Sequence, residues 1–98
     1  MSERSGVGMD ARVTAAECVR WRQFDDELVM VDLQGGEYFA LNAVGARMWD
    51  LLASGKTLAE TATALASEYN AGQDEILGDC TKLADELLKR GLIVLKLP

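Results

Sequence analysis

Apolar and polar positions first repeat with the two-residue period of β-strands. Segment 18–24 alternates valine and tryptophan with two arginines, which indicates a strand with one face in water. Segment 28–33 is almost wholly apolar, as expected of a central strand, and 37–41 is short and aromatic. An acidic turn at 25–27 and a glycine loop at 34–36 join them. The pattern predicts an antiparallel meander of three strands.

Beyond the third strand the apolar positions follow a helical period. Asn42 is a good N-cap for a first helix, which Ser54 and Gly55 end. Thr57 and Glu60 form a capping box that begins a second helix. The inward-facing positions we expect are Val44, Met48, Leu51 and Leu52 in the first helix and Leu58, Ala62, Leu65, Ala66 and Tyr69 in the second.

A third helix, the longest, is predicted in the last third of the chain. Asp74 and Glu75 suit the positive end of its dipole, and Lys89, Arg90 and Gly91 close it. Its inward side is expected to carry Ile76, Cys80, Leu83 and Leu87.

Strands followed by helices are typical of α+β folds, and a winged helix-turn-helix-like domain with the wing first fits this order. We expect residues 1–16 to be a flexible N-terminal segment and residues 17–98 to form a single domain. Segment 93–97 fits either a terminal strand or a cover for the core.

Composition narrows the chemistry. The 98 residues include 10 basic and 16 acidic side chains, a net charge of −6, and no histidine. Histidine is the usual general base and the commonest metal ligand, so we expect no catalytic residues, no metal site and no cofactor. The acidic balance opposes binding to nucleic acid, because phosphate backbones carry the same charge.

Cys18 and Cys80 have no cysteine nearby in the sequence, and both are expected to be reduced, partly buried thiols, although a disulfide between them stays open. No apolar run approaches the roughly 20 residues of a membrane span or the roughly 7 to 15 of a signal-peptide core. We therefore expect a cytoplasmic protein with no membrane partner.

The third strand is a candidate site for a peptide. The edge strands of a meander present unpaired backbone groups, and this one carries no lysine or proline to discourage pairing. An extended peptide can add there as a fourth strand, with the third helix as the neighbouring wall. The candidate residues are Glu37, Tyr38, Phe39, Ala40 and Leu41 on the strand and Gly78, Asp79, Lys82 and Glu86 on the helix.

Each of these residues also has a structural interpretation. Tyr38 and Phe39 point to opposite faces, so one of them belongs to the core. Gly78 either leaves room for an approaching backbone or has no role. The charged helix residues fit a solvated face as well as anchors for a peptide.

The chain resembles the pyrroloquinoline quinone biosynthesis protein D (PqqD) family over residues 17–95. The stretch 37–52 carries most of the resemblance, with Leu-Asn at the end of the strand and Val-Gly-Ala entering the helix. Further matching positions are Thr57, Tyr69, Asp79, Leu83, Leu87, Arg90, Gly91 and Leu92.

The resemblance implies a non-catalytic recognition element that binds the leader of a ribosomally made precursor peptide and presents it to a modifying enzyme. That enzyme would be a radical S-adenosylmethionine protein or, for lasso peptides, a leader protease and cyclase. The resemblance implies residues 37–41 as the pairing edge and Leu77, Asp79, Lys82 and Glu86 as candidates for the helix wall.

Two other functions remain open from the sequence. A structural homodimer could pair two copies of the same strand edge. A winged-helix DNA-binding regulator has the same order of elements, but its third helix would carry an acidic excess into the DNA groove.

Overall fold

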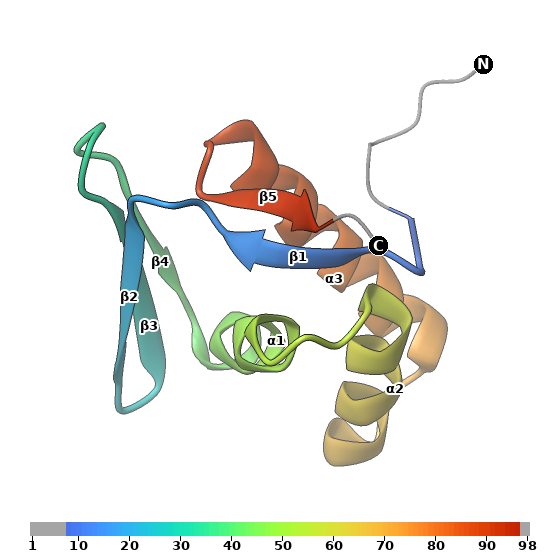
Figure 1. Ribbon diagram of the computed structural model, residues 1–98. Coiled ribbons are helices and arrows are strands. Elements are labelled where there is room, and N and C mark those ends of the chain that lie inside the picture. The colour runs from blue at the N-terminus through green and yellow to red at the C-terminus, as the bar shows by residue number, and fades with distance from the viewer. Residues whose placement is uncertain (1–7, 97–98) are drawn as a thin grey trace.

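The computed structural model describes residues 8–96, which form five strands and three helices. The strands are β1 (Arg12–Ala15), β2 (Val19–Phe24), β3 (Glu27–Asp32), β4 (Tyr38–Leu41) and β5 (Ile93–Lys96). The helices are α1 (Ala43–Ala53), α2 (Leu58–Tyr69) and α3 (Gln73–Lys89). Figure 1 shows the strands β2, β3 and β4 on one side of the molecule and the helices on the other.

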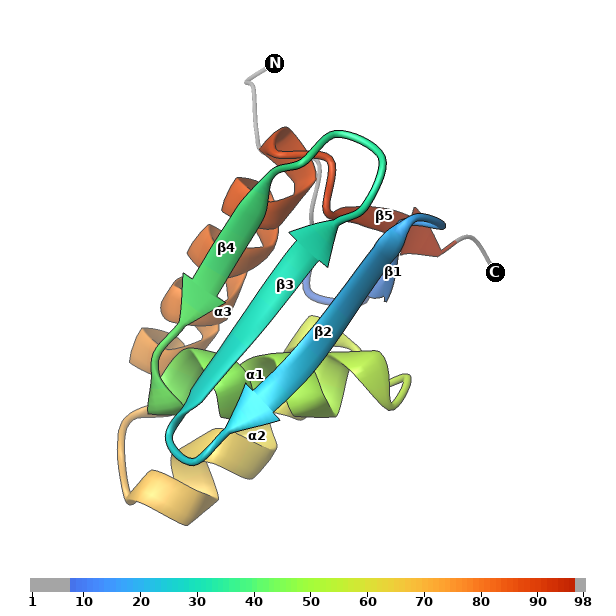
Figure 2. The same ribbon diagram turned by 90° about the vertical axis from the view of Figure 1, so that its left-hand side faces the viewer.

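The main sheet is an antiparallel meander in the order β2-β3-β4, with β3 in the centre. Leu28 of β3 lies opposite Leu41 of β4, and Val31 lies opposite Tyr38. The helices lie behind one face of this sheet, and its other face is turned toward the viewer in Figure 2. The predicted α+β arrangement of three strands followed by three helices is confirmed.

The helix starts follow the predicted caps. The side chain of Asn42 accepts a hydrogen bond from the Gly45 amide at 2.9 Å, which satisfies one free donor of the first turn of α1. The Thr57 hydroxyl accepts from the Glu60 amide at 3.0 Å, and the Glu60 carboxylate accepts from the Thr57 amide at 2.9 Å. This reciprocal pair begins α2, as the sequence predicts.

One hydrophobic core lies between the sheet, the helices and the β1–β5 pair. Its largest fully buried side chains include Met30, Trp49, Leu52, Leu58, Leu65, Leu87, Leu92 and Ile93. The ring of Trp49 meets that of Trp21 edge to face, with 5.2 Å between the ring centroids. Cys18 and Cys80 are both free thiols, so they form no disulfide.

Two predicted inward positions are wrong. Tyr69 is 45% exposed and Val44 is 37% exposed. Each lies in a terminal turn of its helix, Tyr69 as the last residue of α2 and Val44 as the second of α1. The helical period places a residue on the inner side of a helix, but it does not require a neighbouring element to extend over the terminal turns.

The prediction that residues 1–16 are flexible is wrong for 12–15, which form β1. This strand pairs with β5 in an antiparallel two-stranded sheet, with Val13 opposite Leu95. Val13 is only 3% exposed, so β1 contributes to the core. Segment 93–97, left open by the sequence, is a strand over residues 93–96, and residue 97 lies outside the described range.

The N-terminal part of the described chain also contacts the start of α2. The carbonyls of Met9 and Ala11 accept hydrogen bonds from the amides of Ala59 and Leu58 at 2.9 and 3.1 Å. The first amides of a helix have no partner inside the helix, so these bonds satisfy donors that would otherwise need water.

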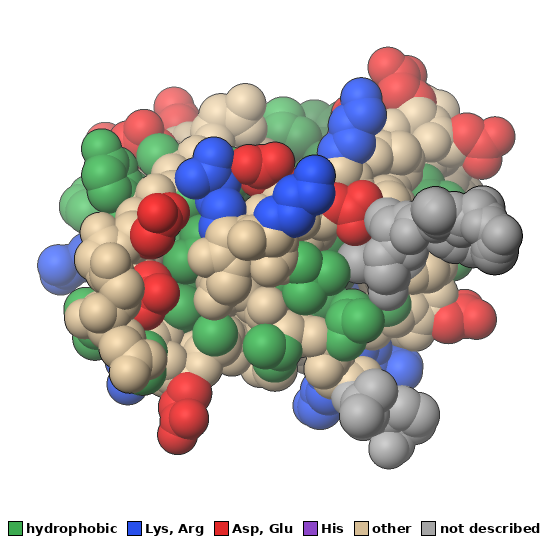
Figure 3. Space-filling view, turned by 90° about the horizontal axis from the view of Figure 1, so that it is seen from above, with side chains coloured by type: hydrophobic (Ala, Val, Ile, Leu, Met, Phe, Trp, Pro, Cys, Tyr) green, Lys and Arg blue, Asp and Glu red, His purple; other side chains and the backbone are tan. Residues whose placement is uncertain are grey.

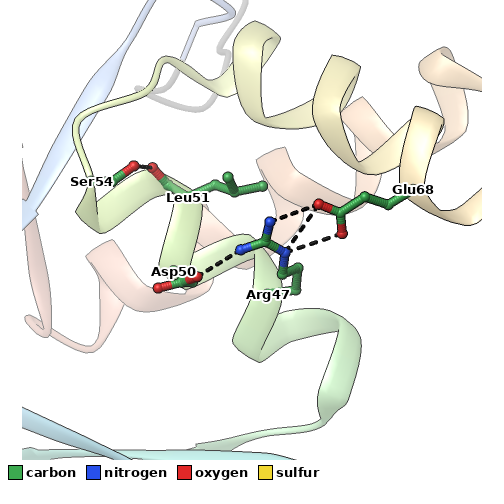
Figure 4. Close-up of polar contacts among 5 residues, drawn as sticks. All are labelled: Arg47, Asp50, Leu51, Ser54 and Glu68. Atoms are coloured by element: carbon green, nitrogen blue, oxygen red, sulfur yellow. Dashed lines mark hydrogen bonds and ion pairs between the residues drawn. The ribbon is translucent and has the colours of Figure 1, made fainter.

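Arg47 links α1 to α2. Its guanidinium donates to Asp50 on the same helix at 2.6 Å and to Glu68 on α2 at 2.7 Å (Figure 4). The bond from Arg47 lowers the pKa of Glu68, because it favours the charged carboxylate. Figure 4 also shows Ser54, whose hydroxyl donates to the Leu51 carbonyl at 2.7 Å as α1 ends.

None of the helices within residues 8–96 has both the length and the apolar character that crossing a membrane would require.

Candidate functional site

The outer edge of β4 is unpaired in the described structure. Over residues 8–96, β4 pairs with β3 alone, and the C-terminal strand β5 pairs with β1 rather than with β4. Figure 2 shows β4 at the border of the sheet, with α3 behind it. A backbone edge and a helix therefore border the same side of the molecule.

The register shows which backbone groups of β4 point outward. The Asp32 amide donates to the Glu37 carbonyl at 2.8 Å, so this opposed pair is hydrogen-bonded across the sheet. In an antiparallel ladder such pairs alternate with pairs whose N–H and C=O groups point away from the partner strand. Phe39 and Leu41 therefore face β3 with their backbone groups, and Tyr38 and Ala40 direct theirs to the free edge.

The side chains of β4 alternate as the sequence predicts. Phe39 is partly buried against the core and Leu41 is 4% exposed, so both lie on the inner face. Tyr38 is 69% exposed on the outer face. Of the two neighbouring aromatic residues, Phe39 is the one that packs on the core.

Residues on one flank of α3, and Arg90 that follows it, lie beside β4 and form a groove with it. Near the end of the helix, the Arg90 guanidinium lies 4.7 Å from the centroid of the Phe39 ring. It donates to Glu86 at 2.8 Å and forms a longer ion pair with Glu37, at 3.7 Å. Arg90 is thus a polar bridge between the helix and the strand.

A hollow of about 450 Å³ lies in the groove between β4 and α3, toward the start of α1. Most of its lining is apolar, and Asp79 is its one charged lining residue. The lining residues are Phe39, Ala40, Leu41, Asn42, Val44, Gly45, Met48, Asp79 and Leu83. The hollow can take an apolar side chain from a strand that lies along β4.

The structure brings some of the candidate helix residues to this groove and leaves others outside it. Asp79 lines the hollow, and Glu86 holds Arg90 beside β4. Lys82 and Gly78 are exposed, and a Cβ atom on Gly78 would meet nothing within 4 Å. Leu77 is partly buried against the core. It precedes Leu83 by six residues, which corresponds to a rotation of about 120° round the helix axis, so it lies on another flank of α3.

Six residues of the groove were missed as site residues in the sequence: Asn42, Val44, Gly45, Met48, Leu83 and Arg90. Leu83 and Val44 were assigned to the core by their helical period, and Arg90 was assigned to the end of a helix. The sequence held a weak signal for Arg90 alone, because a cation that ends an amphipathic helix can reach a neighbouring element. Nothing in the local pattern pointed to β4 as that element.

Cys80, the neighbour of Asp79 in the sequence, is a fully buried thiol. Burial, and secondarily the charge of Asp79, raise the pKa of the Cys80 thiol to about 11, so it stays protonated at neutral pH. Over residues 8–96 no group of three or more metal-binding side chains comes together. Acidic and basic side chains lie next to each other on the face seen in Figure 3, without a continuous basic patch there.

A second hollow, of about 530 Å³, lies on the outer face of the sheet. Apolar side chains and two arginines line it: Arg20, Trp21, Arg22, Phe24, Val29, Val31 and Leu33. It is on the opposite side of the pleat from Phe39, and it is therefore separate from the groove between β4 and α3.

Comparisons with known proteins agree on one family. Residues 27–93 match the family model described as coenzyme PQQ synthesis protein D (PqqD). The structure is similar to "TbiB1 in Complex with the TbiA(beta) Leader Peptide", with a TM-score of 0.77 and 34% identity over 82% of this chain and 93% of the other. It is also similar to "Lasso peptide synthetase B1 complexed with the leader peptide", with a TM-score of 0.80 and 27% identity over 86% and 99%. No curated protein sequence matches the chain significantly.

Proposed function

The chain belongs to the PqqD family, and on that basis we propose that it binds the leader of a ribosomally synthesised precursor peptide and delivers it to a modifying enzyme. The leader adds as a strand to the free edge of β4 and lies against α3. Both solved relatives named above are complexes with a leader peptide, which supports this function.

The unpaired edge of β4 is the observation that carries the proposal. Backbone groups that point outward from Tyr38 and Ala40 offer two amides and two carbonyls to an incoming strand. These main-chain bonds would supply much of the affinity. The hollow beside them would supply selectivity, because it accepts a side chain of limited size and polarity.

We propose that the protein itself is not an enzyme and that the chemistry belongs to its partner. Of the two classes of partner enzyme, the leader protease and cyclase of lasso peptide maturation are favoured, since one solved relative is a lasso peptide synthetase B1. Because precursor peptides are made on ribosomes, we place this binding step in the cytoplasm.

Replacing Ala40 by proline tests strand addition. Proline has no N–H, so Ala40→Pro removes an outward donor without removing a bond to β3. We expect the affinity for a leader peptide that the wild type binds to fall at least tenfold, about 1.4 kcal/mol or more, since neighbouring ladder bonds shift with the lost one. Isothermal titration calorimetry measures the loss.

Ala40→Val is the matched control, because it keeps the amide and suits a strand. It should bind the leader almost as tightly as the wild type, and circular dichroism should show that both variants fold. If the folded Ala40→Pro variant binds as tightly as Ala40→Val, the peptide does not pair with β4. A tight homodimer unaffected by the leader would favour self-pairing of the edge instead.

A further inference from the structure

The guanidinium of Arg90 is held in a fixed place at one end of the groove. The Phe39 ring lies 4.7 Å away and Glu86 accepts from Nε at 2.8 Å. The backbone of Arg90 is fixed as well: its amide donates to the Glu86 carbonyl at 3.1 Å, and Gly91 then turns the chain with φ +73°. Such contacts orient an arginine before any ligand arrives.

The terminal nitrogens of Arg90 keep their donors available. Over residues 8–96, the bond from Nε to Glu86 is the one hydrogen bond made by this guanidinium. Nη1 lies 3.7 Å from the Glu37 carboxylate, which is an ion pair beyond hydrogen-bond length. With 39% of its side chain exposed, Arg90 presents a fork of N–H groups to solvent.

This fork lies beside the backbone positions that a bound strand would use. Arg90 contacts Glu37 and Phe39, the two residues that flank Tyr38, and the backbone groups of Tyr38 point to the free edge. In a strand paired at Tyr38, the side chains opposite Glu37 and Phe39 would lie on the same face of the sheet as the guanidinium.

We propose that Arg90 binds a carboxylate of the incoming peptide, so that the groove selects a leader with an aspartate or glutamate opposite Glu37 or Phe39, on the face of the sheet that Arg90 occupies. This inference rests on the proposed leader binding. A planar guanidinium matches a carboxylate with two parallel N–H···O bonds, which are among the strongest hydrogen bonds in proteins. Arg90 thereby contributes to peptide selectivity as well as bridging α3 and β4.

In the free protein the Glu37 carboxylate forms the ion pair with Arg90 that a carboxylate of the peptide would replace. Its pair with Arg90 is long, and its side chain is 56% exposed, so the carboxylate can turn into water when a better-placed one arrives. Glu86 keeps its shorter bond to Nε and continues to orient the guanidinium. Removing the charge of Glu37 should therefore strengthen the binding of an acidic peptide.

A displayed library of random peptides, each long enough to span the groove, tests this inference even while the natural leader is unidentified. Selection on the wild-type protein should enrich one consensus register with aspartate or glutamate at a fixed position. Selection on Arg90→Glu should replace that acidic residue by lysine or arginine. A role confined to holding α3 against β4 would weaken all peptides together and would leave the preference unchanged.

Lys89→Glu is the matched control. It changes the net charge by the same amount at the neighbouring residue, which lies about 100° round the helix from Arg90. This variant should keep the acidic preference. The selected peptide, synthesised with glutamate or glutamine at the key position, should bind the wild type with about a three- to fivefold difference, and Glu37→Gln should gain about twofold for the glutamate form.

The outcomes separate this inference from the proposed function. Loss of binding to Ala40→Pro by the selected peptides shows that they pair with the β4 edge. If their consensus then has no acidic position, or keeps that position in the selection on Arg90→Glu, the role of Arg90 alone is overturned. No consensus, or selected peptides that bind Ala40→Pro as tightly as the wild type, overturns strand addition and the role of Arg90 with it.

Discussion

At the scale of single residues, the groove depends on where individual side chains point. Phe39 turns to the core and supports Arg90, and its neighbour Tyr38 leaves its backbone groups at the free edge. Adjacent residues in a strand therefore have different roles, because successive side chains point to opposite faces of the sheet and successive backbone groups point to opposite edges. The sequence predicted this alternation, and the register decided which residue has which task.

Gly78 gives a prediction at this scale. A Cβ atom there would meet nothing within 4 Å, and glycine in a helix is about 0.8 to 1.0 kcal/mol less favourable than alanine. Gly78→Ala should stabilise the protein by about 1 kcal/mol and raise the melting temperature by about 4 to 8 °C. Thermal unfolding followed by circular dichroism measures the change.

Gly45→Ala is the contrasting variant. A Cβ atom at Gly45 would lie 3.3 Å from the Leu41 Cβ, which is crowded, so this variant should not share the gain. Leader binding by Gly78→Ala decides the other question about Gly78. Unchanged affinity means that no peptide backbone approaches it, and a clear loss would show that the peptide crosses the helix there.

At the scale of elements, α1 and α2 begin where a side chain satisfies one of their first amides, whereas α3 begins after Gly72 without a side-chain cap. In α2 the capping box makes the Thr57 amide a donor to the Glu60 carboxylate, and this bond is the main cause that lowers the pKa of Glu60. The same helix is held to α1 by Glu68, whose pKa is lowered by Arg47. Both carboxylates are thus favoured in their charged forms in the folded protein.

The pH dependence of unfolding follows from these shifts. A carboxylate whose pKa is lower in the folded state stabilises the fold above its unfolded pKa, and this stability is lost as the pH falls through the folded value. The wild type should therefore be more stable than the Glu60→Gln, Glu68→Gln double variant at pH 7. The difference should shrink below pH 4.5, the ordinary value of both groups.

Urea unfolding at a series of pH values checks this expectation. Glu60→Gln can still accept the bond from the Thr57 amide, whereas Glu68→Gln keeps only one of the two oxygens that accept from Arg47. The change of the difference with pH, rather than its size, therefore reports the charge. A difference in unfolding free energy that is constant from pH 7 to pH 3 would show that these two carboxylates do not contribute through their ionisation.

At the scale of the whole molecule, the two ends of the described chain close the domain together. β1 and β5 pair with each other, and Val13 and Ile93 are 3% and 1% exposed in the core. This pairing occupies the C-terminal strand, and the edge of β4 stays unpaired within residues 8–96. The free edge is thus a property of the overall topology.

Removing residues 1–16 should therefore destabilise the domain. The deletion removes β1, exposes part of the core and leaves the Leu58 and Ala59 amides without their carbonyl partners. Burying a valine alone contributes about 1.5 to 3 kcal/mol, so we expect a loss of at least about 2 kcal/mol in chemical denaturation. Deletion of residues 1–7 keeps all of these contacts and should have little effect. Equal stability of the two shortened chains would contradict the structural role of β1.

Much of the fold followed from local patterns. The capping box at Thr57, the N-cap at Asn42 and the period-two strands are short-range signals, because each depends on residues within a few positions of one another. Their boundaries agree closely with the structure. Where the periodicity was wrong, at Val44 and Tyr69, the residues lie in terminal turns and are more than a third exposed.

The sequence by itself determined the three strands of the meander, the three helices and the short edge strand without lysine or proline. Only the tertiary structure decided that β1 pairs with β5, that Tyr38 and Ala40 direct their backbone groups outward, and that Arg90 reaches Phe39 across the groove. The physical reason is distance along the chain. Local periods and caps act over a few residues, whereas β1 with β5 and Arg90 with Phe39 join segments about 50 to 80 positions apart, whose meeting depends on how all the elements pack.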